Sequence, residues 1–233
     1  MSTDFRKSTV YQIYPKSFCD TNNDGLGDLR GVIEKLDYIK ELGVDYIWLT
    51  PFFVSPQNDN GYDVEDYYNI DPRYGTMADV EELIDEGKKR GIGLMFDMVF
   101  NHVSTRHEWF RKAMDGDPYY KDFFFFRKGK GKGVPPTNWE SKFGGNAWEY
   151  VEKFDEYYLH LFDVTQADLN WDNENVRKEI QKIVRFWMDK GVRGFRFDVV
   201  NLISKAAFED DETGDGRKYY TDGPNIHKYL KEL

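Results

Sequence analysis

Three stretches of this chain share a pattern that restricts the possible folds more than any other feature. In each, a charged helix end is followed by glycine and then by an apolar run: KELGVDYIWL (40–49), KKRGIGLMF (88–96) and MDKGVRGFRF (188–197). Glycine suits the left-handed residue that closes a helix, and the apolar run is typical of a buried parallel strand. A further strand is expected at 10–14. Alternating strands and helices predict parallel strands joined by right-handed crossovers.

Apolar residues ahead of these glycines recur at helical spacing, which predicts amphipathic helices. The two clearest stripes are Leu29, Val32, Ile33, Leu36, Ile39 and Leu42, and Val176, Ile180, Ile183, Val184, Trp187 and Met188. Another helix is expected at 225–233. The count is four βα units, whereas a (β/α)8 barrel has eight in about 250 residues. We expect an α/β fold, the first four units of such a barrel in a truncated chain. A half-barrel or a small open sheet is the alternative.

The third unit is about twice as long as the second, as the intervals Gly43–Gly91 and Gly91–Gly191 show. The excess lies between a strand ending near Val99 and a helix starting near Glu174, and it is rich in glycine, proline and aromatic residues. Loops longer than about 15 residues in a compact domain are usually functional. We therefore expect barrel units up to the third strand in 1–102, a small inserted lobe in 103–170, and the fourth strand with the start of the next helix in 171–233.

Composition removes several classes of function. The net charge of −10 disfavours a nucleic-acid partner, and no apolar run of about 18 residues suggests a membrane span. Residues 1–10 lack the apolar core of a signal peptide, and the single Cys19 excludes an internal disulfide. Together these features predict a cytoplasmic protein without membrane or nucleic-acid partners.

Polar clusters follow the expected strands, where such folds gather their active groups. They lie within 51–70, in DMVFNH (97–102) and in GFRFDVVN (194–201). Arg196 and Asp198 are two apart on a strand, so both point to one face. A nearby cation keeps a carboxyl ionised at neutral pH, as a carboxylate nucleophile requires. A purely structural Arg–Asp pair explains the spacing equally well.

DMVFNH, QADLNW (166–171) and GFRFDVVN, in that order, resemble signature regions of glycoside hydrolase family 13, the α-amylase family. The opening segment YQIYPKSFCDTNNDGLGDLRGVIEKLDYIKELGVDYIWLTP resembles the α-glucosidase branch of that family. This resemblance extends over essentially the whole chain. It implies a glycosidase that acts on a small disaccharide without an organic cofactor.

The resemblance also assigns roles to individual residues. It implies that Asp198 is the catalytic nucleophile and Arg196 the arginine beside it. Asp63 and His102 are expected to bind the sugar whose bond is broken, and Tyr62 to stack beneath that sugar. Asp97 and Asn101 belong to the first signature region, where the family role is mainly architectural.

Retaining glycosidases need a carboxylate nucleophile and a carboxylic acid about 5–5.5 Å apart. The family places its general acid, a glutamate, on the strand after the nucleophile, and a third carboxylate further on. Both positions fall beyond Leu233, and neither Glu140 nor Glu149 matches them. We therefore expect the 233 residues alone to hydrolyse nothing.

The loop DTNNDGLGD (20–28) alternates oxygen-bearing side chains at the first, third, fifth and ninth positions of an EF-hand, with Gly25 at the sixth. Gly31 replaces the usual glutamate at position 12, which favours a static site over a mobile sensor. The resemblance implies a structural Ca²⁺ here, with Mg²⁺ or a solvated acidic turn as the alternatives. The expected ligands are Asp20, Asn22, Asp24, the Leu26 carbonyl and Asp28.

Two segments bear on the substrate. Val199, after the nucleophile, resembles family members that act on α-1,6 links or on trehalose 6-phosphate rather than on maltose. GDGRKYYTDGPNIHKYL (214–230) resembles the loop of members that hydrolyse trehalose 6-phosphate to glucose and glucose 6-phosphate. Candidate phosphate-binding cations are Arg217 and Lys218, with Lys128, Lys130 and Lys132 as weaker candidates.

Other functions remain possible at this point. The first alternative is hydrolysis of isomaltose-type α-1,6 links, as in oligo-1,6-glucosidases. A non-catalytic amylase-like binding protein is a distant alternative. A sugar-binding half-barrel requires that 233 residues be the natural length.

Overall fold

The computed structural model describes residues 5–233, which form two compact units. The first unit contains 5–55, 66–98 and 183–197. The second contains 56–65, 99–182 and 198–233. The chain therefore passes between the units several times.

A four-stranded sheet organises the first unit. Its strands lie in the order β1 (Val10–Ile13), β2 (Tyr46–Leu49), β5 (Gly93–Val99) and β11 (Gly194–Asp198). β1 pairs with β2 and β2 with β5, both in parallel. The spatial order follows the chain order, with helices between the strands, as in successive strands of a (β/α)8 barrel. The four expected strands are confirmed, as is the parallel pairing of the first three.

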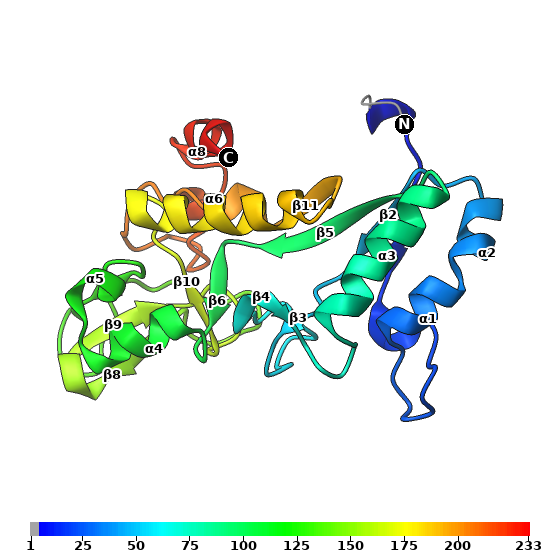
Figure 1. Ribbon diagram of the computed structural model, residues 1–233. Helices are drawn as coiled ribbons and strands as arrows, with labels where there is room; N and C mark the ends of the chain where they lie inside the picture. The colour runs from blue at the N-terminus through cyan, green and yellow to red at the C-terminus, as the bar shows by residue number, and fades with distance from the viewer. Residues whose placement is uncertain (1–4) are drawn as a thin grey trace. The chain divides into compact units, whose positions relative to one another are not determined.

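The helices of this unit are α1 (Leu29–Glu34), α2 (Leu36–Glu41), α3 (Met77–Lys89) and the end of α6 (Glu174–Asp189). The stripe expected before Gly43 is divided between α1 and α2 because Lys35, with φ −96° and ψ 4°, interrupts the helix. α1 and α3 lie side by side (Figure 1). Short elements complete the unit: η1 (Phe5–Lys7), η2 (Pro15–Ser17), β3 (Phe53–Val54) and β4 (Asp66–Ile70).

Large aromatic rings fill the core of the first unit. Phe96 of β5 meets Phe52 and Trp187 edge to face, with ring centroids 4.9 and 5.2 Å apart. The indole of Trp187 donates to the Tyr67 carbonyl at 2.9 Å. Such aromatic pairs add stability beyond the area that they bury, and here they attach the end of α6 to the sheet.

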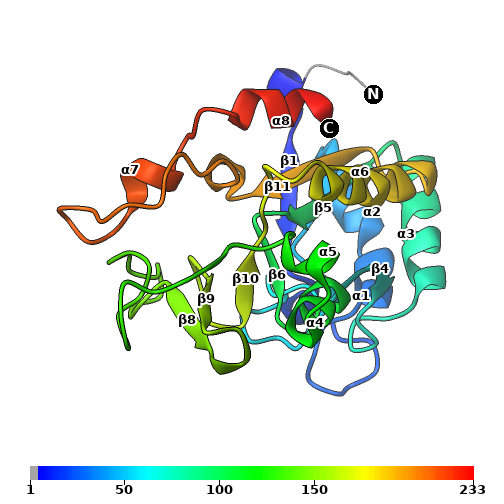
Figure 2. The same cartoon turned by 90° about the vertical axis from the view of Figure 1, so that its left-hand side faces the viewer.

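The second unit contains two antiparallel sheets. β6 (His102–Ser104) pairs with β10 (Gln166–Asp168). β7 (Phe126–Arg127), β9 (Glu156–Leu159) and β8 (Trp148–Val151) form the other sheet in that order. Figure 2 shows β8 beside β9. The other elements of this unit are α4 (Glu108–Asp115), α5 (Pro118–Lys121), η3 (Glu152–Phe154), the start of α6, η4 (Val200–Leu202), α7 (Arg217–Tyr220) and α8 (Ile226–Glu232).

The helix expected near the end of the chain is confirmed as α8. Its Glu232 carboxylate accepts from Arg177 Nε of α6 at 2.6 Å, and its Tyr229 ring packs on Trp171. The three-part domain division at 102 and 170 stays a prediction. Within residues 5–233, none of the helices has the length and apolar character needed to cross a membrane.

Candidate active site

Asp97 and Arg196 form an ion pair in the first unit. Asp97, on β5, is 1% exposed. Nη1 of Arg196 donates to its two carboxylate oxygens at 3.0 and 3.1 Å, and Trp48 Nε1 donates to one of them at 3.0 Å. The guanidinium also lies over the Trp48 ring, 4.9 Å from its centroid. Because charge-assisted bonds to a carboxylate are the strong ones, Asp97 and Trp48 together fix the direction of Arg196.

Asp198 is the last residue of β11 and lies in the second unit. Its negative charge acts on two groups of that unit, the buried His102 and the partly buried Asp59. Burial lowers the pKa of His102, against the opposing charges of Asp168 and Asp198. Burial raises the pKa of Asp59, and the charges of Asp63 and Asp198 act in the same direction. Asp198 thus belongs electrostatically with His102 and Asp59. Its expected pairing with Arg196 stays a prediction.

His102 begins β6 and is 1% exposed. Its Nδ1 lies 3.2 Å from Asn101 Nδ2, and its Nε2 lies 3.2 Å from the Tyr62 carbonyl oxygen. A neutral ring can both accept and donate a hydrogen bond, and its polar neighbours also include Gln166 Nε2, 3.2 Å from His102 Nε2. The lowered pKa favours that neutral ring, which is an uncharged hydrogen-bonding group suited to a sugar hydroxyl.

The turn at 56–65 carries Asp63 and Tyr62. Asp63 is fully buried, and its carboxylate accepts from the amides of Asn58 and Asp59 at 2.8 and 3.2 Å. These bonds close the turn and fix the position of the carboxylate. The Tyr62 ring is half-buried, as a stacking platform requires. Gln166 of β10 donates to Asp59 at 2.9 Å and thereby connects this turn to the β6–β10 sheet.

A fully buried polar group lies beside His102. Lys205 Nζ is 2.8 Å from the Asp168 carboxylate and donates to Asn101 Oδ1 at 2.9 Å. Asn101 Nδ2 donates to Asp168 at 3.0 Å, and the Leu161 amide donates to the same carboxylate at 2.8 Å. Every polar atom here has an ionic or hydrogen-bonded partner, which a buried charge requires. The group therefore fixes Asn101, which in turn contacts His102.

Sequence reasoning missed three of these residues: Asp59, Asp168 and Lys205. Asp168 lies in QADLNW, so a signal was present. Lys205 is the single charged residue in the mostly apolar segment NLISKAAF (201–208), where such a charge indicates a buried partner. Asp59 is one of several polar residues of its loop and carries no distinguishing signal.

The expected metal loop lies in the first unit, with its side chains bonded to the loop's own backbone. Asp20 accepts from the amides of Asn22, Asn23 and Gly25, and Asp24 accepts from that of Leu26. Gly25 has φ +89°, as the turn requires.

Asp28 caps α1 by accepting from the Gly31 amide at 2.7 Å. Burial alone would raise its pKa, but hydrogen bonds from Gly31 and Thr21 lower it. The expected metal ligands of this loop are all oxygen atoms, which suits a hard cation. Among the described residues, no group of three His, Cys, Asp or Glu side chains is arranged around a metal position. The ligand set also includes an amide and a carbonyl, so it stays a prediction.

The candidate phosphate-binding cations have acidic neighbours. Lys218 is 3.1 Å from Asp211, and Arg217 is 3.3 Å from Asp215. The same region holds Lys142, whose Nζ lies 5.2 Å from the centre of the Tyr220 ring of α7. Burial lowers the pKa of Lys142, and the charge of Arg217 lowers it further. Lys142 is therefore a further cation beside Arg217. Of the weaker candidates, Lys130 lies 2.5 Å from Asp210.

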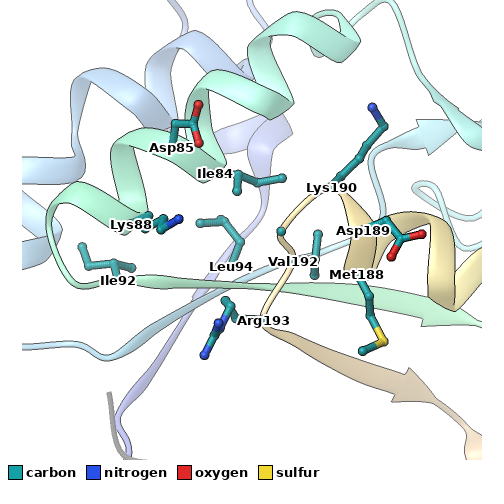
Figure 3. A pocket seen from close by; sticks show the side chains of 11 residues that line it. Ile84, Asp85, Lys88, Ile92, Leu94, Met188, Asp189, Lys190, Val192 and Arg193 are labelled. Atoms are coloured by element: carbon teal, nitrogen blue, oxygen red, sulfur yellow. The ribbon is translucent and has the colours of Figure 1, made fainter.

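A cavity of about 700 Å³ lies elsewhere in the first unit, beside the starts of β5 and β11. Figure 3 shows the apolar side chains of Ile84, Leu94 and Val192 directed toward one another, with charged side chains around them. It lies near the opposite end of β5 from Asp97, and none of the expected site residues lines it. In barrels that end of the strands serves stability rather than catalysis.

Several known proteins are similar to this chain in sequence and in fold. It is 58% identical to the trehalose-6-phosphate hydrolase of Bacillus subtilis over 98% of its length, covering 41% of that protein. It is 52% identical to the oligo-1,6-glucosidase of Bacillus cereus, covering 98% of the chain and 42% of the relative. The crystal structure of Bacillus licheniformis trehalose-6-phosphate hydrolase superposes with a TM-score of 0.96 at 57% identity, over 100% of this chain and 43% of that one.

This chain thus spans about two fifths of the length of these relatives. Their fold confirms the expectation that its α/β arrangement is the N-terminal part of a (β/α)8 barrel. The catalytic-domain model of alpha amylase matches residues 12–233. The chain therefore belongs to the alpha-amylase family of glycoside hydrolases.

Proposed function

We propose that the full-length protein is a retaining α-glucoside hydrolase that cleaves trehalose 6-phosphate to glucose and glucose 6-phosphate. One observation carries the proposal. Asp198 ends β11 two residues after Arg196, in a chain 58% identical to a trehalose-6-phosphate hydrolase. The oligo-1,6-glucosidase relative at 52% identity supports the alternative, hydrolysis of isomaltose-type links.

In the proposed reaction, Asp198 forms a bond to the anomeric carbon of the glucosyl unit. The bond from that carbon to the bridging oxygen breaks, and the departing glucose 6-phosphate takes a proton from a carboxylic acid. The family resemblance places that acid on the strand after β11. Water then attacks the glucosyl–Asp198 ester. The carboxylate left by the general acid accepts the proton of that water. Two inversions at one carbon give net retention.

The other residues position the sugar in this proposal. Tyr62 stacks beneath the glucosyl ring, while Asp63 and neutral His102 bond its hydroxyls. Asp97 holds Arg196 through the bonds at 3.0 and 3.1 Å, so Asp97 acts through the arginine. Fixed partners of this kind reduce the reorganisation needed when substrate binds.

The phosphate is assigned in this proposal to the cations around α7. Arg217 and Lys218 are exposed and Lys142 lies beside them, so an anion can reach all three. A phosphate brought near Lys142 and Arg217 relieves the repulsion between two like charges. Isomaltose has no phosphate and gains nothing from these cations.

The test compares kcat/KM for trehalose 6-phosphate and isomaltose, measured on the full-length protein. We expect at least a tenfold preference for the phosphorylated sugar. Arg217→Gln combined with Lys142→Gln should lower kcat/KM for trehalose 6-phosphate about tenfold or more, the effect of losing a charged hydrogen bond, without changing that for isomaltose.

Lys178→Gln combined with Lys182→Gln removes the same two charges from the surface of α6, where Lys178 pairs with Glu174 at 2.6 Å and Lys182 with Glu179 at 2.7 Å. This control variant should leave kcat/KM unchanged for both substrates. Equal or better activity of the wild type on isomaltose contradicts the proposal and favours the oligo-1,6-glucosidase alternative.

We also propose a structural Ca²⁺ at residues 20–28, with Mg²⁺ as the weaker alternative. Asp20, Asn22, Asp24 and Asp28 supply side-chain oxygens and Leu26 a carbonyl. An ion there neutralises the acidic loop ahead of α1. A cytoplasmic location belongs to the same proposal, because a phosphorylated disaccharide does not cross a membrane unaided.

A further inference from the structure

Val199, directly after Asp198, has a backbone conformation that β-branched residues rarely adopt. Its φ is 39° and its ψ is 36°, in the left-handed region. The other non-glycine residues with positive φ in the described part of the chain are all acids or amides: Asn23, Gln57, Asn60, Asp155 and Asp222. Asn and Asp tolerate this region, whereas the left-handed conformation of valine is strained. The turn that follows Asp198 therefore stores strain.

A cluster of buried residues holds the Val199 side chain. Val199 packs against this aromatic cluster, whose members are Phe125, Trp139, Ala147, Trp148, Tyr157, Leu159, Leu161, Leu202 and Tyr220. All of them belong to the second unit, as Val199 does. The cluster supplies the packing energy that keeps a valine in an unfavourable conformation.

Hydrogen bonds restrain the same turn. The Leu202 amide donates to the Val199 carbonyl at 2.9 Å and closes η4. The Asp222 amide donates to the Asn201 carbonyl at 2.8 Å. At Gly223 an added Cβ would lie 2.0 Å from the Ser204 carbonyl oxygen, so the two segments are in close contact. A strained residue persists only where its surroundings enforce the conformation, and here they do so from several sides.

We propose that Val199 is a positioning residue whose enforced left-handed turn sets the direction of the Asp198 carboxylate. β11 is extended through Asp198, and the chain reverses at the next residue. A relaxed Val199 would rotate the peptide that follows Asp198 and move the carboxylate from its line of attack. The inference rests on the proposed function only in that Asp198 is the nucleophile. It does not depend on which glucoside is cleaved.

The strain gives a specific expectation. Leu202→Ala weakens the aromatic cluster, so Val199 can relax and kcat falls. Adding Val199→Asn to that variant restores kcat, because asparagine accepts the left-handed conformation without being held there. The alternative is that the Val199 side chain acts by contacting the sugar. In that case Val199→Asn would lower kcat further in the Leu202→Ala background instead of restoring it.

The experiment uses the full-length protein and p-nitrophenyl α-glucoside, which carries no phosphate. We expect Leu202→Ala to lower kcat about tenfold, equivalent to about 1.4 kcal/mol, with KM changed less than twofold. The rate at which 5-fluoro-α-glucosyl fluoride labels Asp198, followed by mass spectrometry, should fall in parallel. Leu202→Ala/Val199→Asn should return both rates to within about threefold of wild type. Any loss of activity in Val199→Asn alone should fall on kcat and on the labelling rate together, with KM changed less than twofold.

Asp155→Gly is the matched control, because Asp155 also has a positive φ of 52° but lies in the turn between η3 and β9. It should leave the labelling rate unchanged. Absence of rescue in the double variant, or a Val199→Asn effect confined to KM, overturns the inference. If the wild type does not label at Asp198, the proposed function fails instead.

Discussion

The buried Lys205–Asp168 pair allows a quantitative stability prediction. Both side chains are 0% exposed, and the ammonium lies 2.8 Å from the carboxylate. Lys205→Met keeps the volume but leaves a buried carboxylate without its counter-ion. Breaking such a pair costs about 3–5 kcal/mol. Asn101 and the Leu161 amide still donate to Asp168, so we expect the lower end, about 3 kcal/mol.

The shift is about 2–4 °C per kcal/mol for 150–250 residues and smaller for a longer protein, so Lys205→Met should lower the melting temperature of the full-length protein by a few degrees. Scanning calorimetry measures this directly. Lys190→Met is the control, because Lys190 pairs with Glu81 at the surface, at 2.5 Å, and should cost under about 1 kcal/mol.

Adding Asp168→Asn to Lys205→Met removes the unpaired charge and should restore part of the loss. A melting temperature equal to that of wild type for Lys205→Met, or a double variant less stable than the single one, would refute the reasoning.

Three further predictions concern the candidate site. Asp198→Asn should lower kcat by on the order of 10³-fold or more without changing the melting temperature, as glucose release and calorimetry would show; residual activity above a tenth of wild type contradicts its role as nucleophile. Burial lowers the folded-state pKa of His102, so the stability from its neutral ring is complete above the unfolded value of about 6.5 and lost as pH falls through the folded pKa. The melting temperature of wild type should therefore drop more than that of His102→Gln between about pH 7.5 and 5, and parallel curves would contradict this. Ca²⁺ should raise the melting temperature of wild type, and Asp24→Asn should weaken Ca²⁺ binding at least about tenfold by calorimetry; heat of binding equal in both proteins would remove the loop 20–28 as the site.

Much of the fold was predictable because its signals are local. Gly43, Gly91 and Gly191 have positive φ, and an apolar strand follows each. Helical spacing gave α6 and α8 correctly. The division of the first helical stripe into α1 and α2 was not predictable, because nothing in the sequence marks Lys35 as a break. Leu36 and Ile39 stay buried after that break, whereas Leu42, at the C-terminal end of α2, is exposed.

The site was predictable only where a motif marks it. Asp198, Arg196 and His102 stand in signature segments, so their positions at strand ends could be expected. Their partners are distant in the chain: Arg196 pairs with Asp97, and Asn101 with Lys205. Local patterns carry no information about such pairs. The turn at Val199 was equally hidden, because valine favours extended backbone and only the packed cluster around it enforces the left-handed conformation.

The charge distribution constrains how a phosphorylated sugar could be selected. The net charge of −10 on these 233 residues repels an anionic substrate at long range, so this part of the protein does not concentrate it by electrostatic attraction. Discrimination must then come from contacts shorter than the screening length of about 8 Å. The segment before and within α7 alternates acids with bases, and Lys218 and Arg217 lie beside Asp211 and Asp215. A neutral sugar meets a segment whose charges already compensate one another. A phosphate competes with the two carboxylates for the same cations. It carries two negative charges, whereas each carboxylate carries one. Selection is therefore a difference between two ion pairs.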